Sequence, residues 1–486
     1  MFNKVQILLF SASLVLIVGS TKSLAKDQPK SSEVADAVQR QSAKLTSPRQ
    51  GWDFKFRDFV IGAWWGPRAT DAEVLVYKEA GFNLAMAGRY MWGDDAAFDK
   101  NKPTYNPEAG TIKSLKTHLD LLDKHKVAAL IDVYYLNYLT SGPWWNDEHK
   151  AEPRLYDRYG SEPNLSVGQS TDTSIKWLNE IFGNHPALAG YLLGDDKGEL
   201  PPDIVEATHF LRKEAPQLLP WVCQNVMNAQ SLAEAGNPIM DPQMYPTLYQ
   251  KDRPASEQAR LYCQLLQQLR QDCLKYNLIM WPMFNSCGVK SDSLTRFQIY
   301  SSLAYGAQGI WNFHYEGGFV KRPSQFFNGF TTIKEMKKHL SPTWHDAKLA
   351  NKRTAAWGPK LLGRIAAEIY QSEETNATER TPEKGRLVEK MNDNLLVGIL
   401  YKADEPLLAM VVDKRVSIDR DALAPRQVKI NFADTVTRID VLEAESIETH
   451  HRNIINLTLP AGGGQLLKLQ GDSININPSN QQNIYP

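Results

Sequence analysis

The sequence predicts an α/β fold, a (β/α)₈ TIM barrel followed by a small all-β sandwich domain. Eight short apolar runs alternate with amphipathic stretches over roughly 260 residues, which is the usual size of such a barrel. These runs are apolar on both faces, as in strands of a parallel sheet that helices cover. Beyond residue 386 the pattern changes to strands with partial period-two alternation and no helix, which is typical of an antiparallel sandwich.

The amino terminus has the organisation of an export signal. Lys4 precedes an apolar run over 7–18, and small residues stand at Ser23 and Ala25. This run is shorter than the roughly 20 residues that a spanning helix requires. We therefore expect a cleaved signal peptide over 1–25 and a secreted or periplasmic protein, with an uncleaved membrane anchor as the alternative. A polar, flexible leader is expected over 26–50.

Charge and metal-ligand content narrow the classes of function. The chain has 55 Lys and Arg against 55 Asp and Glu, and loss of residues 1–25 removes only two lysines. A nearly neutral chain without basic clusters lacks the electrostatic footprint for nucleic acid or anionic membrane. We therefore expect a neutral substrate, no nucleic-acid partner and no membrane span after signal cleavage; the oligomeric state is left open. The histidines show no metal-ligand spacing, so neither a metal nor an organic cofactor is expected.

The four cysteines permit disulfides in an exported chain. However, Cys263 and Cys273 lie on one predicted helix, too far apart along its axis to bond each other.

The repeating units follow one another along the first two thirds of the chain. The expected strands cover 59–65, 82–88, 127–136, 187–194, 219–226, 239–246, 278–285 and 309–318. Helices are expected between most of them, the clearest with an apolar stripe through Tyr262, Leu266 and Leu269. A doubly wound open sheet is the alternative, but it would need a phosphate-binding glycine turn after the first strand, where this chain has WWGPRAT.

The domain boundaries follow from these patterns. We expect the barrel over 51–369, a polar linker over 370–386, the sandwich over 387–471 and a tail over 472–486. The expected sandwich strands cover 394–401, 407–413, 427–432, 437–443, 453–459 and 463–469.

Candidate functional residues follow the apolar runs, because the active site of such a barrel lies at the carboxyl ends of its strands. They are Trp64, Trp65, Arg89, Asp132, Tyr135, Asp195, Asp196, Asn225, Asp241, Tyr245, Asn285, His314 and Glu316. Aromatic faces stack on sugar rings, while acids and amides bind hydroxyl groups. Hydrolysis of a glycosidic bond needs one carboxylic acid and one carboxylate. This composition therefore predicts a carbohydrate site.

A family resemblance points the same way. The segment GYLLGDDKGELP over 190–201 resembles the G-Y-x-x-x-D-E-P segment at the end of strand four in a broad group of barrel glycoside hydrolases and glycosidase-like proteins. MYP over 244–246, AYGAQGI over 304–310 and PAGGGQLLKL over 460–469 are also similar to that group. The resemblance covers about 58–469 and implies that the acid at the end of strand four is the general acid.

The chain departs from the group at three positions. Asp196 stands in place of Glu, Lys197 in place of Pro, and Asn285 where the retaining enzymes have their nucleophilic Glu. A retaining mechanism with two glutamates is therefore not implied for this chain.

The resulting hypothesis is an exported glycoside hydrolase that cleaves a neutral oligo- or polysaccharide. Asp196 is expected to be the general acid and Glu316 the second carboxylate, with Asp241 and Asp132 as further candidates. Because side chains alternate along a strand, Asp195 and Asp196 are expected to point to different sides. Retention or inversion is left open. The alternative function is a non-catalytic carbohydrate-binding protein on a degenerate barrel.

Overall fold

The computed structural model describes residues 51–87, 112–133, 171–249, 252–326, 328–372 and 387–471. The expected signal peptide, leader and tail lie outside these ranges, as do Arg89, Tyr135 and the expected linker from residue 373 onward.

Eight parallel strands close into a barrel, as the sequence predicts. Neighbouring strands pair in the order β5-β4-β3-β2-β1-β9-β8-β6, and β6 pairs back onto β5 to close the ring. The two-residue strand β7 pairs with β6 just before β8. The strands are β1 (Val60–Ala63), β2 (Leu84–Ala87), β3 (Ala128–Asp132), β4 (Leu188–Gly194), β5 (Leu219–Gln224), β6 (Ile239–Met244), β7 (Ile279–Met280), β8 (Met283–Asn285) and β9 (Gly309–Phe313).

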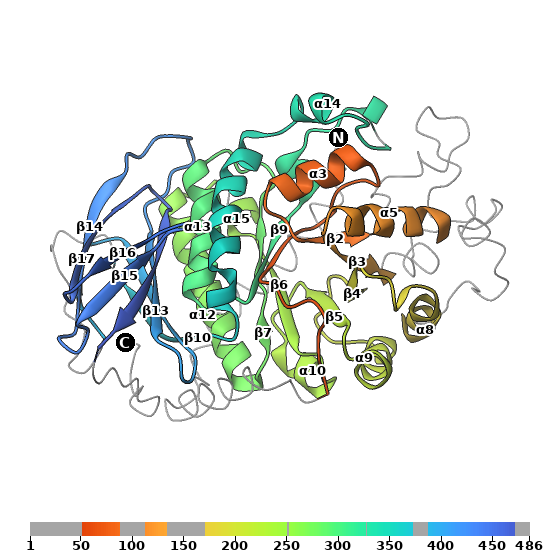
Figure 1. The fold of residues 1–486 in the computed structure, drawn as a ribbon, viewed down its shortest axis with the longest axis horizontal. Helices are drawn as coiled ribbons and strands as arrows, with labels where there is room; N and C mark the ends of the chain where they lie inside the picture. Colours follow the sequence, from red (N-terminus) through yellow and green to blue (C-terminus); the bar gives the residue numbers. More distant parts are fainter. Residues whose placement is uncertain are drawn as a thin grey trace.

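Helices surround the barrel (Figure 1). They are α3 (Asp71–Glu79), α5 (Ile112–Lys124), α8 (Thr171–Phe182), α9 (Pro202–Glu214), α10 (Ala229–Glu234), α11 (Pro246–Tyr249), α12 (Ala255–Tyr276), α13 (Asp292–Ala304), the turns η3 (Tyr315–Phe319) and η4 (Ser324–Phe326), α14 (Ile333–Lys337) and α15 (Pro342–Leu361). Several begin where the sequence offers a capping hydroxyl: Thr70, Ser291 and Ser341 each accept a hydrogen bond from a backbone N–H of the first turn.

The barrel interior is filled by large aromatic side chains. Trp64, Trp221, Trp281 and Trp311 are all buried in one cluster with aliphatic residues of the strands. At the amino ends of the strands, the segment before β1 hydrogen-bonds to the residues before β5, and its Phe54 packs against the same cluster. The amino end of the barrel is therefore covered by the chain itself.

The carboxy-terminal region is a sandwich of two antiparallel sheets, as predicted. One sheet has the order β10-β12-β13-β18-β15-β16 and the other β11-β14-β17. The strands are β10 (Ile365–Gln371), β11 (Val388–Met391), β12 (Leu395–Tyr401), β13 (Leu407–Asp413), β14 (Arg426–Phe432), β15 (Arg438–Leu442), β16 (Ile447–His450), β17 (Ile454–Leu459) and β18 (Gly464–Gln470). The six expected strands are present, and β10, β11 and β16 are additional.

The boundary between the domains lies earlier than residue 370. β10 pairs antiparallel with β12 along its whole length, so it belongs to the sandwich and not to the barrel. The sequence interpretation missed this strand because an apolar run that directly follows a long helix also fits a further barrel element.

The sandwich packs on the barrel through α13 and α15 (Figure 1). Nearly every residue of α13 is buried, because the barrel covers one side of this helix and the six-stranded sheet covers the other. Gly398 of β12 lies against the end of α13, where a Cβ atom would come within 1.8 Å of the Ala304 carbonyl oxygen. A glycine at this position lets the sheet approach the helix backbone.

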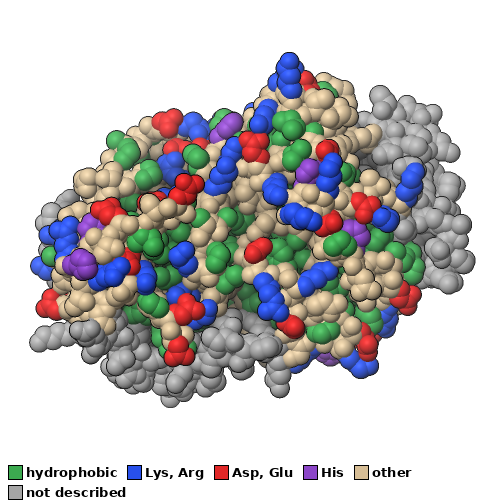
Figure 2. All heavy atoms as spheres, in the orientation of Figure 1, with side chains coloured by type: hydrophobic (Ala, Val, Ile, Leu, Met, Phe, Trp, Pro, Cys, Tyr) green, Lys and Arg blue, Asp and Glu red, His purple; other side chains and the backbone are tan. Residues whose placement is uncertain are grey.

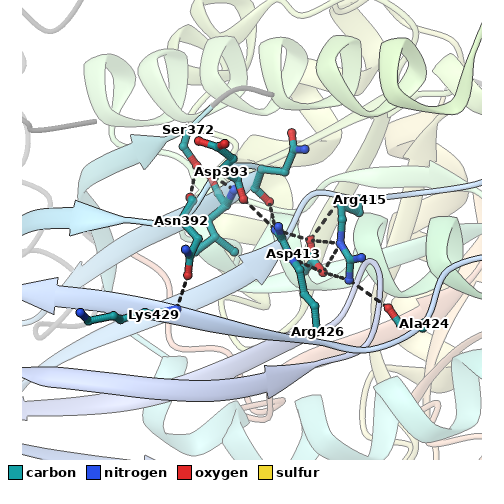
Figure 3. A network of polar contacts seen from close by, with 10 residues as sticks. Ser372, Asn392, Asp393, Asp413, Arg415, Ala424, Arg426 and Lys429 are labelled. Carbon is teal, nitrogen blue, oxygen red and sulfur yellow. Dashed lines mark hydrogen bonds and ion pairs between the residues drawn. The ribbon is translucent and has the colours of Figure 1, made fainter. Parts of the chain in front are cut away.

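A buried carboxylate ties the two sheets of the sandwich together (Figure 3). Asp413, fully buried at the end of β13, accepts from Arg415 in its own sheet's connection and from Arg426 on β14 of the other sheet, both at 2.8–2.9 Å. Arg426 also donates to the carbonyl oxygens of Asp393 and Asn394. Paired with two guanidinium groups, the carboxylate is compensated, and it fixes the register of one sheet against the other.

We predict that Gly398→Ala lowers the free energy of unfolding by about 3 kcal/mol or more, since the added methyl group meets a helix carbonyl that cannot yield. Urea unfolding measures this loss. Gly198→Ala is the matched control, because its Cβ meets nothing closer than 4.0 Å. Equal stability of the two variants would contradict the described packing.

Candidate active site

The candidate site lies at the carboxyl ends of β4, β5 and β6. Asp195 and Asp196 follow β4 directly, and both carboxylates accept hydrogen bonds from the Gln243 side chain of β6. Gln243 Nε2 lies 3.3 Å from Asp195 Oδ1 and 2.6 Å from Asp196 Oδ1. The two carboxylate oxygens are therefore within 5.9 Å of each other.

The expectation that these neighbours point to different sides is wrong. The β4–β5 pairing shifts register between Leu192 and Gly194, and Asp196 has a left-handed backbone with φ of 55°. Strict alternation holds only while the strand remains extended. Because β4 ends at Gly194, the two carboxylates can share one donor.

Gln243 was not among the residues that the sequence singled out. It lies two residues after Asp241 on β6, so both side chains point to the same side of the strand. Its Nε2 also lies 3.5 Å from the Cys223 sulfur of β5. The alternation of polar residues in IMDPQM was the one signal that could have revealed it.

Asp241 lies deeper than this pair and is fully buried. Its Oδ2 accepts a 2.6 Å hydrogen bond from Trp221 Nε1, while its Oδ1 has no hydrogen-bond partner. Trp221 in turn stacks on Trp311 with ring centroids 4.1 Å apart, and Trp64 meets it edge-on at 5.4 Å. Asp241 and Trp64 thus belong to the barrel interior beneath the mouth.

Burial dominates the electrostatics of this carboxylate group. It raises the pKa of Asp241 well above the usual value, and the nearby charge of Asp195 adds to the effect. Asp196 remains accessible to solvent at its outer edge, but the surrounding protein still raises its pKa, against the hydrogen bond from Gln243 and the charge of Lys197. Burial and the three carboxylates also raise the pKa of Cys223, so this thiol stays protonated and unreactive.

Aromatic side chains form another part of the mouth, after β1 and β9. Trp65 is half-buried, with its ring centroid 4.2 Å from that of His314. Phe313, also half-buried, stacks on the buried Tyr245 at 4.7 Å. Tyr245 directs its hydroxyl to the Met283 sulfur at 2.9 Å, inside the barrel. Trp65 and Phe313 are therefore the rings here that a ligand could reach.

Glu316 is placed in a buried group of charges in η3. Its Oε1 lies 3.0 Å from Arg68 Nε and accepts from Arg322 Nε at 3.0 Å. Arg322 also binds Glu73 of α3. In these surroundings Glu316 has two cationic partners, unlike the Asp195–Asp196 pair.

The other predicted residues lie as follows. Asn285 is fully buried, donates to the Cys287 carbonyl oxygen and accepts from the Cys287 N–H, so its amide shapes the turn after β8. Asp132 is buried at the end of β3, beside Leu192 of β4. Asn225 is half-buried just after β5.

Two further searches concern ligands of other kinds. Within the described residues, no group of three or more His, Cys, Asp and Glu side chains could hold a metal ion. All four cysteines are free thiols.

The fold and this mouth define a (β/α)₈ barrel with a cluster of carboxyl groups at the carboxyl ends of its strands. No protein-family model matches the chain, and no curated protein matches it. Among solved structures it is similar in fold to the α-amylase of Geobacillus thermoleovorans, at 12% identity and a TM-score of 0.46, covering 83% of this chain and 92% of that one. It is also similar to α-galactosidase I of Mortierella vinacea, at 11% identity and a TM-score of 0.40, with the same coverage.

We predict that Asp241→Asn changes how stability depends on pH. A carboxyl group whose pKa is raised by folding stabilises the protein below its unfolded pKa, and this contribution is lost as pH rises through the folded pKa. The stability advantage of the wild type over Asp241→Asn should therefore shrink from about pH 4 upward, by up to about 1.4 kcal/mol per pH unit. Urea unfolding between pH 4 and pH 8 tests this, and a constant difference would show that Asp241 does not stay protonated in the folded protein.

Proposed function

We propose that this protein is a glycoside hydrolase whose two acting carboxyl groups are Asp195 and Asp196. The observation that carries the proposal is the shared Gln243 donor, which keeps the two carboxylates within 5.9 Å at an accessible strand end. Asp196 is the general acid, since burial raises its pKa and so favours the protonated form that a leaving oxygen needs. Asp195, 8% exposed, is the second carboxylate in place of Glu316.

The separation of the pair supports retention of anomeric configuration. Retaining glycosidases hold their carboxyl groups about 5–5.5 Å apart, whereas inverting ones need about 6.5–9.5 Å to admit a water molecule. Gln243 limits the Asp195–Asp196 separation to the shorter range for the oxygens that it binds. In this mechanism Asp196 protonates the leaving oxygen, and Asp195 attacks the anomeric carbon before water releases the sugar.

The substrate that we propose is a neutral oligo- or polysaccharide. Trp65 and Phe313 offer half-exposed rings on which a pyranose can stack. Acidic and basic side chains are interspersed on the face of the molecule drawn in Figure 2, which therefore has no large surface of one sign to attract a polyanion.

We also propose that the protein is exported, on the strength of the apolar run over 7–18 and the small residues at Ser23 and Ala25. No helix in the described part of the chain is long and apolar enough to cross a bilayer.

One observation favours a second function, that of a carbohydrate-binding protein without catalysis. Asn285 occupies the end of β8 with its amide engaged in a buried turn, so this strand supplies no acid to the mouth. Only the Asp195–Asp196 pair then separates the two functions.

The test is release of 4-nitrophenol from a panel of 4-nitrophenyl glycosides. We predict that Asp196→Asn lowers kcat by about 10²–10⁴-fold on any glycoside that the wild type hydrolyses, because the proton donor is lost. Glu199→Gln is the control, since it neutralises an exposed carboxylate three residues along the same loop. NMR of the first-formed anomer should show retention; an inverted product would remove Asp195 as the nucleophile.

A wild-type protein that releases nothing from this panel, or from neutral polysaccharides, would contradict the hydrolase. Binding of the same sugars measured by calorimetry would then support the second function.

A further inference from the structure

The loop after β1 and the segment after β9 are joined at three successive points. The Tyr315 N–H donates to the Trp64 carbonyl oxygen at 2.7 Å. The ring of His314 lies 4.2 Å from that of Trp65. Arg68 Nε lies 3.0 Å from Glu316 Oε1. Residues 64–68 are thus attached to residues 314–316 by a backbone bond, a ring contact and an ion pair.

The ion pair belongs to a closed group of two acids and two bases. Arg322 binds Glu316 with Nε at 3.0 Å and Glu73 with Nη2 at 2.8 Å. Glu73 also accepts the Arg68 N–H at 3.0 Å and the Phe330 N–H at 2.9 Å. The four charged side chains are each no more than 6% exposed. Equal numbers of acids and bases compensate one another here, so the group is stable only when all four are present.

The charge state of Glu73 agrees with this picture. Burial alone would raise its pKa, but the hydrogen bonds and charge of Arg322 hold the pKa of Glu73 below its usual value. The group is therefore ionised, and Arg68 is anchored from two sides: its guanidinium by Glu316 and its backbone by Glu73.

We propose that Glu316 is a positioning residue, which through Arg68 holds the loop after β1 so that Trp65 keeps its ring at the barrel mouth. Trp65 needs such support because its backbone is left-handed, with φ of 54°, a conformation that residues other than glycine rarely adopt. The inference rests on the proposed function only in taking Trp65 as a stacking face for sugar. It assigns Glu316 no proton transfer.

The position of Glu316 agrees with this role. Oε1 is shared between two guanidinium groups, and Oε2 is buried without a hydrogen-bond partner. A carboxyl group in such a place acts on the loop that it binds.

The test needs no substrate. The protein is labelled with 5-fluorotryptophan, and the Trp65 resonance is identified by its absence in Trp65→Phe. In Glu316→Gln we expect the Trp65 fluorine resonance to shift and broaden, and the Tyr315 amide to exchange with solvent at least about tenfold faster. Both follow because Arg68 loses its anionic partner and the loop detaches from η3.

The matched control is Glu405→Gln. This change also removes a carboxylate from a buried arginine, Arg364, whose carbonyl oxygen binds Gln308 before β9, at the opposite end of that strand. Its Trp65 resonance and Tyr315 exchange should equal those of the wild type. Unchanged Trp65 and Tyr315 signals in a folded Glu316→Gln protein would overturn the proposal.

A charge-balanced variant guards against failure to fold. Glu316→Gln combined with Arg68→Gln removes one acid and one base and leaves the Glu73–Arg322 pair intact. The same shift, broadening and faster exchange are expected, since Arg68 no longer anchors the loop. A Trp65 signal identical to that of the wild type in this double variant would likewise overturn the proposal.

Kinetics separate positioning from proton transfer. On a 4-nitrophenyl glycoside that the wild type hydrolyses, Glu316→Gln should raise KM by about tenfold with little change in kcat, because a stacking face and not an acid is disturbed. A loss of kcat as large as that of Asp196→Asn, with the Trp65 resonance unmoved, would make Glu316 a catalytic acid. If the wild type hydrolyses no glycoside, the proposed function fails while the fluorine and exchange measurements still decide the role of Glu316.

Discussion

Closure of the barrel between β5 and β6 is the constraint on which the candidate site depends. The pairing of Cys223 with Asp241 brings the two strands into register. One pleat further along, Gln243 then reaches across to the carboxylates that follow β4. A parallel barrel gathers all its carboxyl ends at one mouth, so residues nearly 50 positions apart in the chain become direct neighbours. Without this closure, Asp195 and Asp196 would have no common donor.

Buried carboxyl groups near this mouth are accommodated in two different ways. Asp241 has a single neutral donor, Trp221, and burial raises its pKa so that the uncharged form is favoured. Glu73 has a cationic partner and two backbone donors, and its pKa is lowered. The difference follows from desolvation: a buried acid either gains compensating charges or keeps its proton. The first solution suits a group placed beside reacting carboxyl groups, and the second suits a group that holds a loop.

The sandwich contributes to the fold as a second cover for the barrel. Apolar residues of its larger sheet, among them Leu396, Leu408 and Leu466, join the same core as the barrel helices. Its two sheets share a separate core and the buried Asp413. Because α13 is enclosed from both sides, the barrel and the sandwich are packed as one body around this helix.

The sequence by itself determined the architecture, and tertiary structure decided the site. Eight apolar runs and the later change of period predicted the barrel and the sandwich, because side-chain periodicity reports which faces are buried. It could not predict that a register shift and a left-handed Asp196 bring two adjacent carboxylates to one amide. Nor could it pair Glu316 with Arg68, almost 250 residues away, or give Gln243 a role. Such contacts depend on how distant segments meet in three dimensions, whereas periodicity depends only on near neighbours in the chain.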